Sequence, residues 1–178
     1  MTGPAGRGPG TSGIVAAELD FRAAPVDVGD GAALVGAMID EMRELYWDVG
    51  GEGGDGLDLN SPDMPKAGPA ELGPPGGVFL VGYREDVAVC GGGVKRLADG
   101  ACEVKRMYVV PSARGQGLAR VLLHALEDAA RGLGYEVARL DTGPRQPHAQ
   151  GLYEDEGYVE VANFNANPVA TFFGEKRL

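Results

Sequence analysis

The stretch of sequence that decides the fold reads Val109-Val110-Pro111-Ser112-Ala113-Arg114-Gly115-Gln116-Gly117-Leu118-Ala119-Arg120. We expect a strand before it, over 104–110, and an amphipathic helix after it. Its glycines let the backbone approach a ligand, and the first turn of a helix leaves several N–H groups without partners. These donors, the helix dipole and the two arginines favour an anion such as a pyrophosphate. The stretch therefore predicts a site for a phosphorylated cofactor.

Two other phosphate-binding motifs fit this turn less well. A Walker loop needs Gly-Lys-Ser/Thr, which the chain lacks. A dinucleotide fingerprint needs G-x-G-x-x-G directly after a strand, with an acid about 20 residues later. Gly115, Gly117 and Asp141 imitate part of it, but Arg120 occupies the third glycine position and residues 111–114 separate the strand from the first glycine. A nucleotide-dependent oxidoreductase is therefore the less favoured alternative.

Composition limits the class of protein. The 178 residues suffice for one domain with a sizeable core, and we expect a disordered Gly/Pro-rich tail over 1–16 and a single domain over 17–178. The net charge of −10 argues against nucleic-acid binding, which needs basic patches. It suits a cationic amine substrate, but its first interpretation is solubility. The tail has no apolar segment typical of a secretory signal, and no apolar run is long enough to span a membrane. We expect a cytoplasmic protein with no membrane partner.

The cysteines and histidines predict neither a disulfide nor a metal site. Two of each are too few and too scattered for a zinc pattern. If 98–100 form a turn, Cys90 lies about 17–20 Å from Cys102 along the hairpin. A disulfide tolerates only about 7 Å between Cα atoms. We expect buried thiols and solvent-facing His124 and His148.

Hydrophobic periodicity predicts a mixed α/β domain. Strands are expected at 21–24, 78–83, 87–97, 101–110, 137–141, 158–161 and 171–178. Helices are expected at 32–47, at 116–133 and from Gln146-Pro147 onward. Residues 51–77 are expected to form a long loop, either irregular throughout or with a short helix at 69–72. Gly91 to Gly93 are expected to weaken their strand or mark a bulge. The segment 101–141 predicts a parallel strand–helix–strand unit.

Two longer patterns run through these elements. The first is Glu103-x-Lys105-Arg106-Met107-Tyr108-Val109-x-Pro111-x-x-Arg114-Gly115-x-Gly117. The second is Leu140-x-Thr142-Gly143-x-x-Gln146-Pro147-x-Ala149-x-x-Leu152-Tyr153-x-x-x-Gly157-Tyr158. Together with the turn, they resemble the GNAT superfamily of N-acetyltransferases, whose acetyl-CoA pyrophosphate loop reads Q/R-x-x-G-x-G/A. The resemblance covers about residues 17–178 and implies a GNAT fold, acetyl-CoA as cosubstrate, an amine acceptor and, as in many relatives, a homodimer.

The resemblance also implies the cofactor contacts. Main-chain groups of Met107 and Val109 would pair with pantetheine where the two parallel strands separate, and an N–H near Val109 would polarise the thioester. Gln146 stands where many members have an asparagine that binds the cofactor amide. The turn and helix start would hold the pyrophosphate through Arg114, Gly115, Gln116, Gly117, Leu118, Ala119 and Arg120.

Two residues are candidates for the proton transfers. Glu103 precedes Met107 by four residues, so strand alternation predicts that their side chains share a face. An acid at this place acts as a general base through water in several family members; the alternative is a surface glutamate that balances Lys105 and Arg106. Tyr153 resembles the family's general acid, and its phenol is protonated near neutral pH, so we favour this role; the alternative is a core tyrosine on the inner face of its helix.

The acceptor amine is not identified by these motifs. The first helix with the loop after it, and the segment from Asn163 to Pro168, are expected to shape its site. Tyr46 and Trp47, at the end of that helix, either wall the pocket or pack as core aromatics, and the sequence does not decide between the two. The leading interpretation is direct acetyl transfer to an amine of a small molecule or peptide, which needs no covalent enzyme intermediate because the thioester is already activated. The alternative from another class is a non-catalytic module that binds acyl-CoA.

Overall fold

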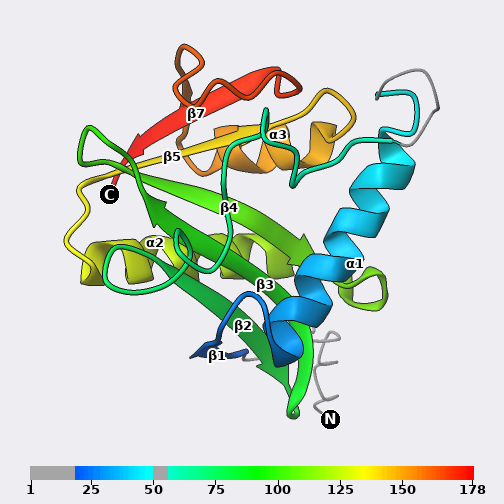
Figure 1. The fold of residues 1–178 in the computed structure, drawn as a ribbon. Coiled ribbons are helices and arrows are strands. Elements are labelled where there is room, and N and C mark those ends of the chain that lie inside the picture. The colour runs from blue at the N-terminus through cyan, green and yellow to red at the C-terminus, as the bar shows by residue number, and fades with distance from the viewer. Residues whose placement is uncertain (1–18, 50–55) are drawn as a thin grey trace, which may run out of the picture.

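The protein is a mixed α/β domain, as predicted, and its computed structural model describes residues 19–49 and 56–178. One seven-stranded sheet has the order β1-β2-β3-β4-β5-β7-β6 (Figure 1). The strands are β1 (Asp20–Ala23), β2 (Val78–Arg84), β3 (Val87–Arg96), β4 (Cys102–Val109), β5 (Val137–Thr142), β6 (Val159–Glu160) and β7 (Phe172–Arg177). The helices are α1 (Gly29–Leu45), η1 (Pro111–Ala113, a 3₁₀ turn), α2 (Leu118–Gly132) and α3 (Pro147–Asp155). The predicted tail, 1–16, lies outside the described residues.

The sheet opens between its two parallel strands. Strands β4 and β5 are parallel, whereas the other neighbouring strands are antiparallel. Among the described residues, β4 pairs with β5 only at Cys102↔Ala138 and Glu103↔Arg139. Both strands continue beyond these pairs, to Val109 and Thr142. The ends of β4 and β5 therefore separate, as the resemblance implies for the cofactor site.

Helices cover the two faces of the sheet unequally. On one face, α2 and α3 pack over a core that includes Leu122, Leu126 and Leu140. On the other face, α1 covers the half of the sheet formed by β2, β3 and β4, and its Leu34 and Met38 belong to a second core (Figure 1). The β5 and β7 half of that second face has no helix over it within residues 19–49 and 56–178. A site can therefore form there beside α1.

The glycine run 91–93 does not interrupt β3. A Cβ atom on Gly92 would lie 2.8 Å from Leu126, and one on Gly93 would lie 2.7 Å from Leu72. Glycine is needed here because the elements that cover the strand approach its backbone closely. The irregularity instead falls on the partner strand, where Gly93 pairs with Lys105 and Gly91 pairs with Tyr108.

This irregularity is a bulge in β4 at Arg106, whose φ is +56°. After an extra residue, strand alternation reverses. Met107 packs against the α2 core, as Val104 does, whereas Tyr108 packs in the α1 core. The prediction that Glu103 and Met107 share a face of the sheet is therefore wrong, because Glu103 alternates with Val104.

Smaller differences have local causes. Of the two possibilities for residues 69–72, the structure shows a turn within a loop instead of a short helix: Leu72 N donates to Gly68 O, and Gly73 and Pro74 follow before a helix can continue. Cys90 and Cys102 are buried free thiols, as predicted, and burial raises their pKa values to about 11 and about 12. His124 and His148 are exposed, also as predicted. None of the helices in the described residues is long and apolar enough to cross a bilayer.

Candidate active site

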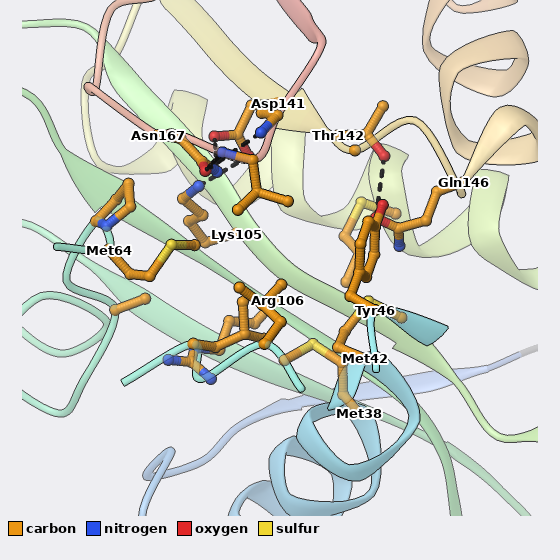
Figure 2. A pocket seen from close by; sticks show the side chains of 18 of the residues that line it. Met38, Met42, Tyr46, Met64, Lys105, Arg106, Asp141, Thr142, Gln146 and Asn167 are labelled. Atoms are coloured by element: carbon orange, nitrogen blue, oxygen red, sulfur yellow. Dashed lines mark hydrogen bonds and ion pairs between the residues drawn. The ribbon is translucent and has the colours of Figure 1, made fainter. Parts of the chain in front are cut away.

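A cavity of about 140 Å³ lies where β4 and β5 separate (Figure 2). Its walls come from α1, the loop 57–67, strands β4 and β5, the start of α3 and the loop 167–170. One wall is apolar and includes Met38, Met42, Leu57, Leu59 and Met64. The facing wall carries charged and polar groups, Lys105, Arg106, Asp141, Thr142, Gln146 and Asn167. The cavity therefore suits a small molecule that has both an apolar and a polar part.

A charged cluster stands at the polar wall. Lys105 Nζ lies 2.8 Å from Glu103 Oε1 and 2.8 Å from Asp141 Oδ1. Asn165 Nδ2 donates to the same two carboxylates, at 2.6 Å and 2.7 Å, and Asn167 Nδ2 donates to Asp141 at 2.9 Å. Figure 2 shows Asp141, Asn167 and Lys105 converging at this end of the cavity. The loop before β7 is thus held onto β4 and β5.

In this cluster, the ionic contacts and hydrogen bonds together affect the pKa values of Asp141 and Lys105 more than burial does. Burial alone would raise the pKa of Asp141, but Lys105 and the amides of Asn165 and Asn167 hold that pKa below its usual value. Burial alone would lower the pKa of Lys105, but Asp141 and Glu103 hold it above its usual value. Both groups are therefore charged at neutral pH.

Glu103 lies behind this wall. Its side chain is fully buried, and it does not line the cavity. Its Oε2 has no hydrogen-bond partner among the described residues and lies 3.7 Å from Lys95 Nζ. The carboxylate that does line the cavity is Asp141, which the sequence analysis missed as a site residue. Its signal was a charged residue near the end of an apolar strand.

Tyr153 and Met107 meet at the cavity from opposite elements. Tyr153 lies on α3 with its ring buried, and its hydroxyl is 3.8 Å from Met107 Sδ. Burial, together with the Asp141 charge, raises the pKa of this phenol, so it is protonated at neutral pH. Gln146, at the start of α3, lines the same cavity and accepts a hydrogen bond from Thr142 Oγ1 at 3.3 Å. The sequence-predicted Met107, Tyr153 and Gln146 are thus brought together.

The two aromatic residues at the end of α1, Tyr46 and Trp47, lie in different environments. Tyr46 is buried, lines the cavity and accepts a hydrogen bond from Arg145 N at 3.1 Å. Trp47 is 65% exposed and does not line the cavity, so it neither walls the site nor packs in the core. Adjacent residues project in different directions at a helix end, and only one of them can face the sheet.

The turn before α2 presents free backbone donors. Gly115 and Gly117 have φ values of +74° and +76°, which glycine adopts without strain, and a Cβ on either would meet nothing within 4 Å. Within the described part of the chain, the N–H groups of residues 115–119 have no internal acceptor. A backbone of this kind fits an anionic group such as a pyrophosphate.

The arginines of this turn are paired with carboxylates. Arg114 Nη2 lies 2.7 Å from Glu41 on α1, and Arg114 Nε donates to Val109 O at 2.9 Å. Arg120 Nε lies 2.6 Å from Glu156. Gln116 accepts from Arg84 at 2.9 Å, and the buried Leu118 side chain leaves only its main chain for a ligand. In this structure the donors of the turn are therefore backbone groups.

Comparison with known proteins assigns the chain to a family. Residues 39–158, about two thirds of the chain, match the model of the acetyltransferase (GNAT) family. The chain belongs to the GNAT family. It is 39% identical over 87 residues to an IAA acetyltransferase of Azospirillum brasilense, a match that covers 48% of this chain and 57% of that relative. It is 29% identical over 153 residues to an uncharacterised N-acetyltransferase of Schizosaccharomyces pombe, covering 82% of this chain and 91% of that one.

Solved GNAT structures share its fold. A Klebsiella pneumoniae protein assigned as an acyl-CoA N-acyltransferase has a TM-score of 0.67 and 29% identity, with 91% of this chain and 99% of that chain covered. The PaiA N-acetyltransferase of Thermoplasma acidophilum, solved with coenzyme A, has a TM-score of 0.61 and 14% identity, with 90% and 99% covered. The predicted GNAT fold is therefore confirmed.

Within this GNAT domain, the cavity and the turn are linked by β4. The strand lines the cavity through Met107 and leads through η1 to the turn at Gly115 and Gly117. Among the described residues, no group of three or more His, Cys, Asp or Glu side chains gathers as a metal site would require. The arrangement places a turn with N–H groups unpaired within the described residues, a gap between strands and a buried phenol on or beside β4.

Proposed function

We propose that the chain transfers an acetyl group from acetyl-CoA to a primary amine by direct attack in a ternary complex. The observation that carries the proposal is the meeting of Met107, Tyr153 and Asp141 at one cavity, where β4 and β5 separate next to a turn with free N–H donors. A thioester is activated already, so positioning, a proton acceptor and a proton donor suffice.

The donor would lie along the gap between the strands. The backbone of residues 115–119 would hold the pyrophosphate, with Arg114 and Arg120 adding charge if they leave their carboxylate partners. Main-chain groups of Met107 and Val109 and the Gln146 amide would hold the pantetheine arm. Because Val109 O already accepts from Arg114, we expect cofactor binding to be accompanied by movement of the Arg114 side chain.

The proton transfers need two groups. Tyr153 is a neutral phenol beside the cavity and would donate a proton to the leaving thiolate. For the proton of the amine, Glu103 is the candidate from the sequence and would act through water. Asp141 is the candidate that the cavity adds, since it is a carboxylate residue that lines the cavity.

Thiol release from acetyl-CoA in the presence of a mixed panel of primary amines tests the proposal. We expect release that depends on the amine, with the acetylated amine identified by mass spectrometry. If acetyl-CoA binds but no amine in the panel is acetylated, the chain is instead a non-catalytic module that binds acyl-CoA. If acetyl-CoA does not bind at all, the GNAT domain does not use this cofactor.

A further inference from the structure

Arg106 is a cation of the cavity wall that forms no ion pair with a carboxylate among the described residues. Its side chain lines the cavity, and Figure 2 shows it on the side away from Thr142 and Gln146. Its hydrogen bond within the described residues runs from Nη2 to the neutral Asn60 Oδ1 at 3.2 Å. The Nη1 atom is buried and has no partner in residues 19–49 and 56–178. A buried donor without a partner is costly, so it indicates a partner supplied from elsewhere.

The neighbouring charges do not supply this partner. The carboxylates of Glu103 and Asp141 are engaged by Lys105, and Lys95 lies 3.7 Å from Glu103. Within residues 19–49 and 56–178, two carboxylates thus face two ammonium groups, and the Arg106 guanidinium remains in excess. Counted over these described residues, the polar wall and its ion-pair partners carry one net positive charge, which one monoanion would balance.

The backbone holds Arg106 in this place at a cost. Its φ of +56° lies in the left-handed region, which non-glycine residues rarely adopt. The bulge that creates this conformation turns the side chain into the cavity instead of continuing the alternation of β4. The fold thus maintains an uncommon backbone conformation that presents a guanidinium to the cavity.

We propose that Arg106 recognises a carboxylate on the acceptor, so that the preferred acceptor is a small amino acid with an apolar body. This proposal rests on the proposed acetyl transfer. The guanidinium would pair with the carboxylate through its planar donors. The hydrocarbon part would pack on Met38, Met42 and Met64, whose flexible side chains adapt to its shape. The amine would then point toward Tyr153, across the cavity.

A binding experiment tests the carboxylate site without turnover. Hexanoate and hexan-1-ol, which share a chain but differ in charge, are titrated calorimetrically into the full chain saturated with coenzyme A. We expect hexanoate to bind at least about 10-fold more tightly than hexan-1-ol, and Arg106→Met to remove this preference. Arg106→Lys should keep part of it. Arg139→Met, which removes a guanidinium paired with Asp99 and Glu175 outside the cavity, should keep all of it.

A kinetic experiment tests the acceptor class. Acetyl transfer is compared for amino acids and their decarboxylated amines, such as methionine with 3-(methylthio)propylamine and 6-aminohexanoate with pentylamine. We expect Arg106→Met to lower kcat/KM for the amino acids by about 10- to 100-fold, with little effect on the plain amines or on the KM for acetyl-CoA.

The outcomes separate this proposal from the proposed function. Equal binding of hexanoate and hexan-1-ol to the wild-type chain, or a preference that survives in folded Arg106→Met, overturns the carboxylate site even if amines are acetylated. A hexanoate preference that depends on Arg106 supports the site even if no amine is acetylated, in which case the proposed transfer fails alone. If Arg106→Met does not fold, the wild-type comparison and Arg106→Lys decide the question.

Discussion

Replacement of Tyr153 by phenylalanine should separate catalysis from stability. Tyr153 is buried, and the hydrogen bond of its hydroxyl within the described residues goes to the weak acceptor Met107 Sδ at 3.8 Å. Removing a hydroxyl that makes no strong hydrogen bond should change the free energy of unfolding by less than about 1 kcal/mol. If the phenol protonates the leaving thiolate, kcat should fall by about 10- to 10⁴-fold, which corresponds to roughly 1.4–5.5 kcal/mol in the barrier.

Tyr158 offers a matched control from the same cluster. Its ring lies 6.0 Å from that of Tyr153, and its hydroxyl donates to the buried Glu127 carboxylate at 3.0 Å. Tyr158→Phe should therefore lower the free energy of unfolding by about 1.5–3 kcal/mol and leave kcat nearly unchanged. Urea unfolding and steady-state thiol release measure both quantities for both variants. Normal turnover in Tyr153→Phe would refute the reasoning and make Tyr153 a core residue only.

Three further predictions concern the wall of the cavity and the sheet behind it. Asp141→Asn leaves Lys105 with a weaker set of partners and should cost about 3–5 kcal/mol at pH 7. Because folding lowers the pKa of Asp141, the difference in the free energy of unfolding between wild type and variant should persist above pH 3.8, the ordinary pKa, and shrink as the pH falls through the lowered folded pKa. Urea unfolding at pH 7 and pH 3 measures this difference, and the same value at both pH values would contradict the prediction. Glu103→Gln should lower kcat/KM mainly at low pH and recover partly at high pH, whereas pH profiles identical to wild type would assign proton removal to Asp141 or solvent. Gly92→Ala should lower the free energy of unfolding by about 1–3 kcal/mol, because its Cβ would lie 2.8 Å from Leu126. Thermal or urea unfolding measures this, and an unchanged midpoint would show that Leu126 and α2 shift at little energetic cost.

Local chemistry explains which parts of the fold were predictable. The helix periodicity, the turn at Ala98 to Gly100 and the glycines before α2 each act over a few residues, and the structure places those elements within a few residues of the expected ranges. The bulge at Arg106 has a long-range cause. It lies where β4 pairs with the glycine run of β3, and the side chains of Leu126 and Leu72 pack closely on the backbone of that run. Alternation along β4 alone therefore put Glu103 on the wrong face.

In the candidate site, too, the residues within sequence motifs were predictable and those placed by long-range contacts were not. Met107, Tyr153 and Gln146 were found from the order of residues in two motifs, and they line one cavity. The apolar wall was missed because Met64 comes from an irregular loop whose path is set by tertiary contacts. The role of Asp141 in the wall was missed because its partners, Asn165 and Asn167, lie over 20 residues away in the chain.

Calorimetric titration of acetyl-CoA tests the central claim most directly. The wild-type chain should bind acetyl-CoA at one site, with no heat from NAD or ATP at the same concentrations. Gly117→Asp should abolish binding because its carboxylate would meet the pyrophosphate. Gly117→Asn, of the same size without the charge, should bind more weakly than wild type but measurably. No binding of acetyl-CoA at millimolar concentration, or unchanged binding by a folded Gly117→Asp variant, would contradict the assignment of this turn to the cofactor.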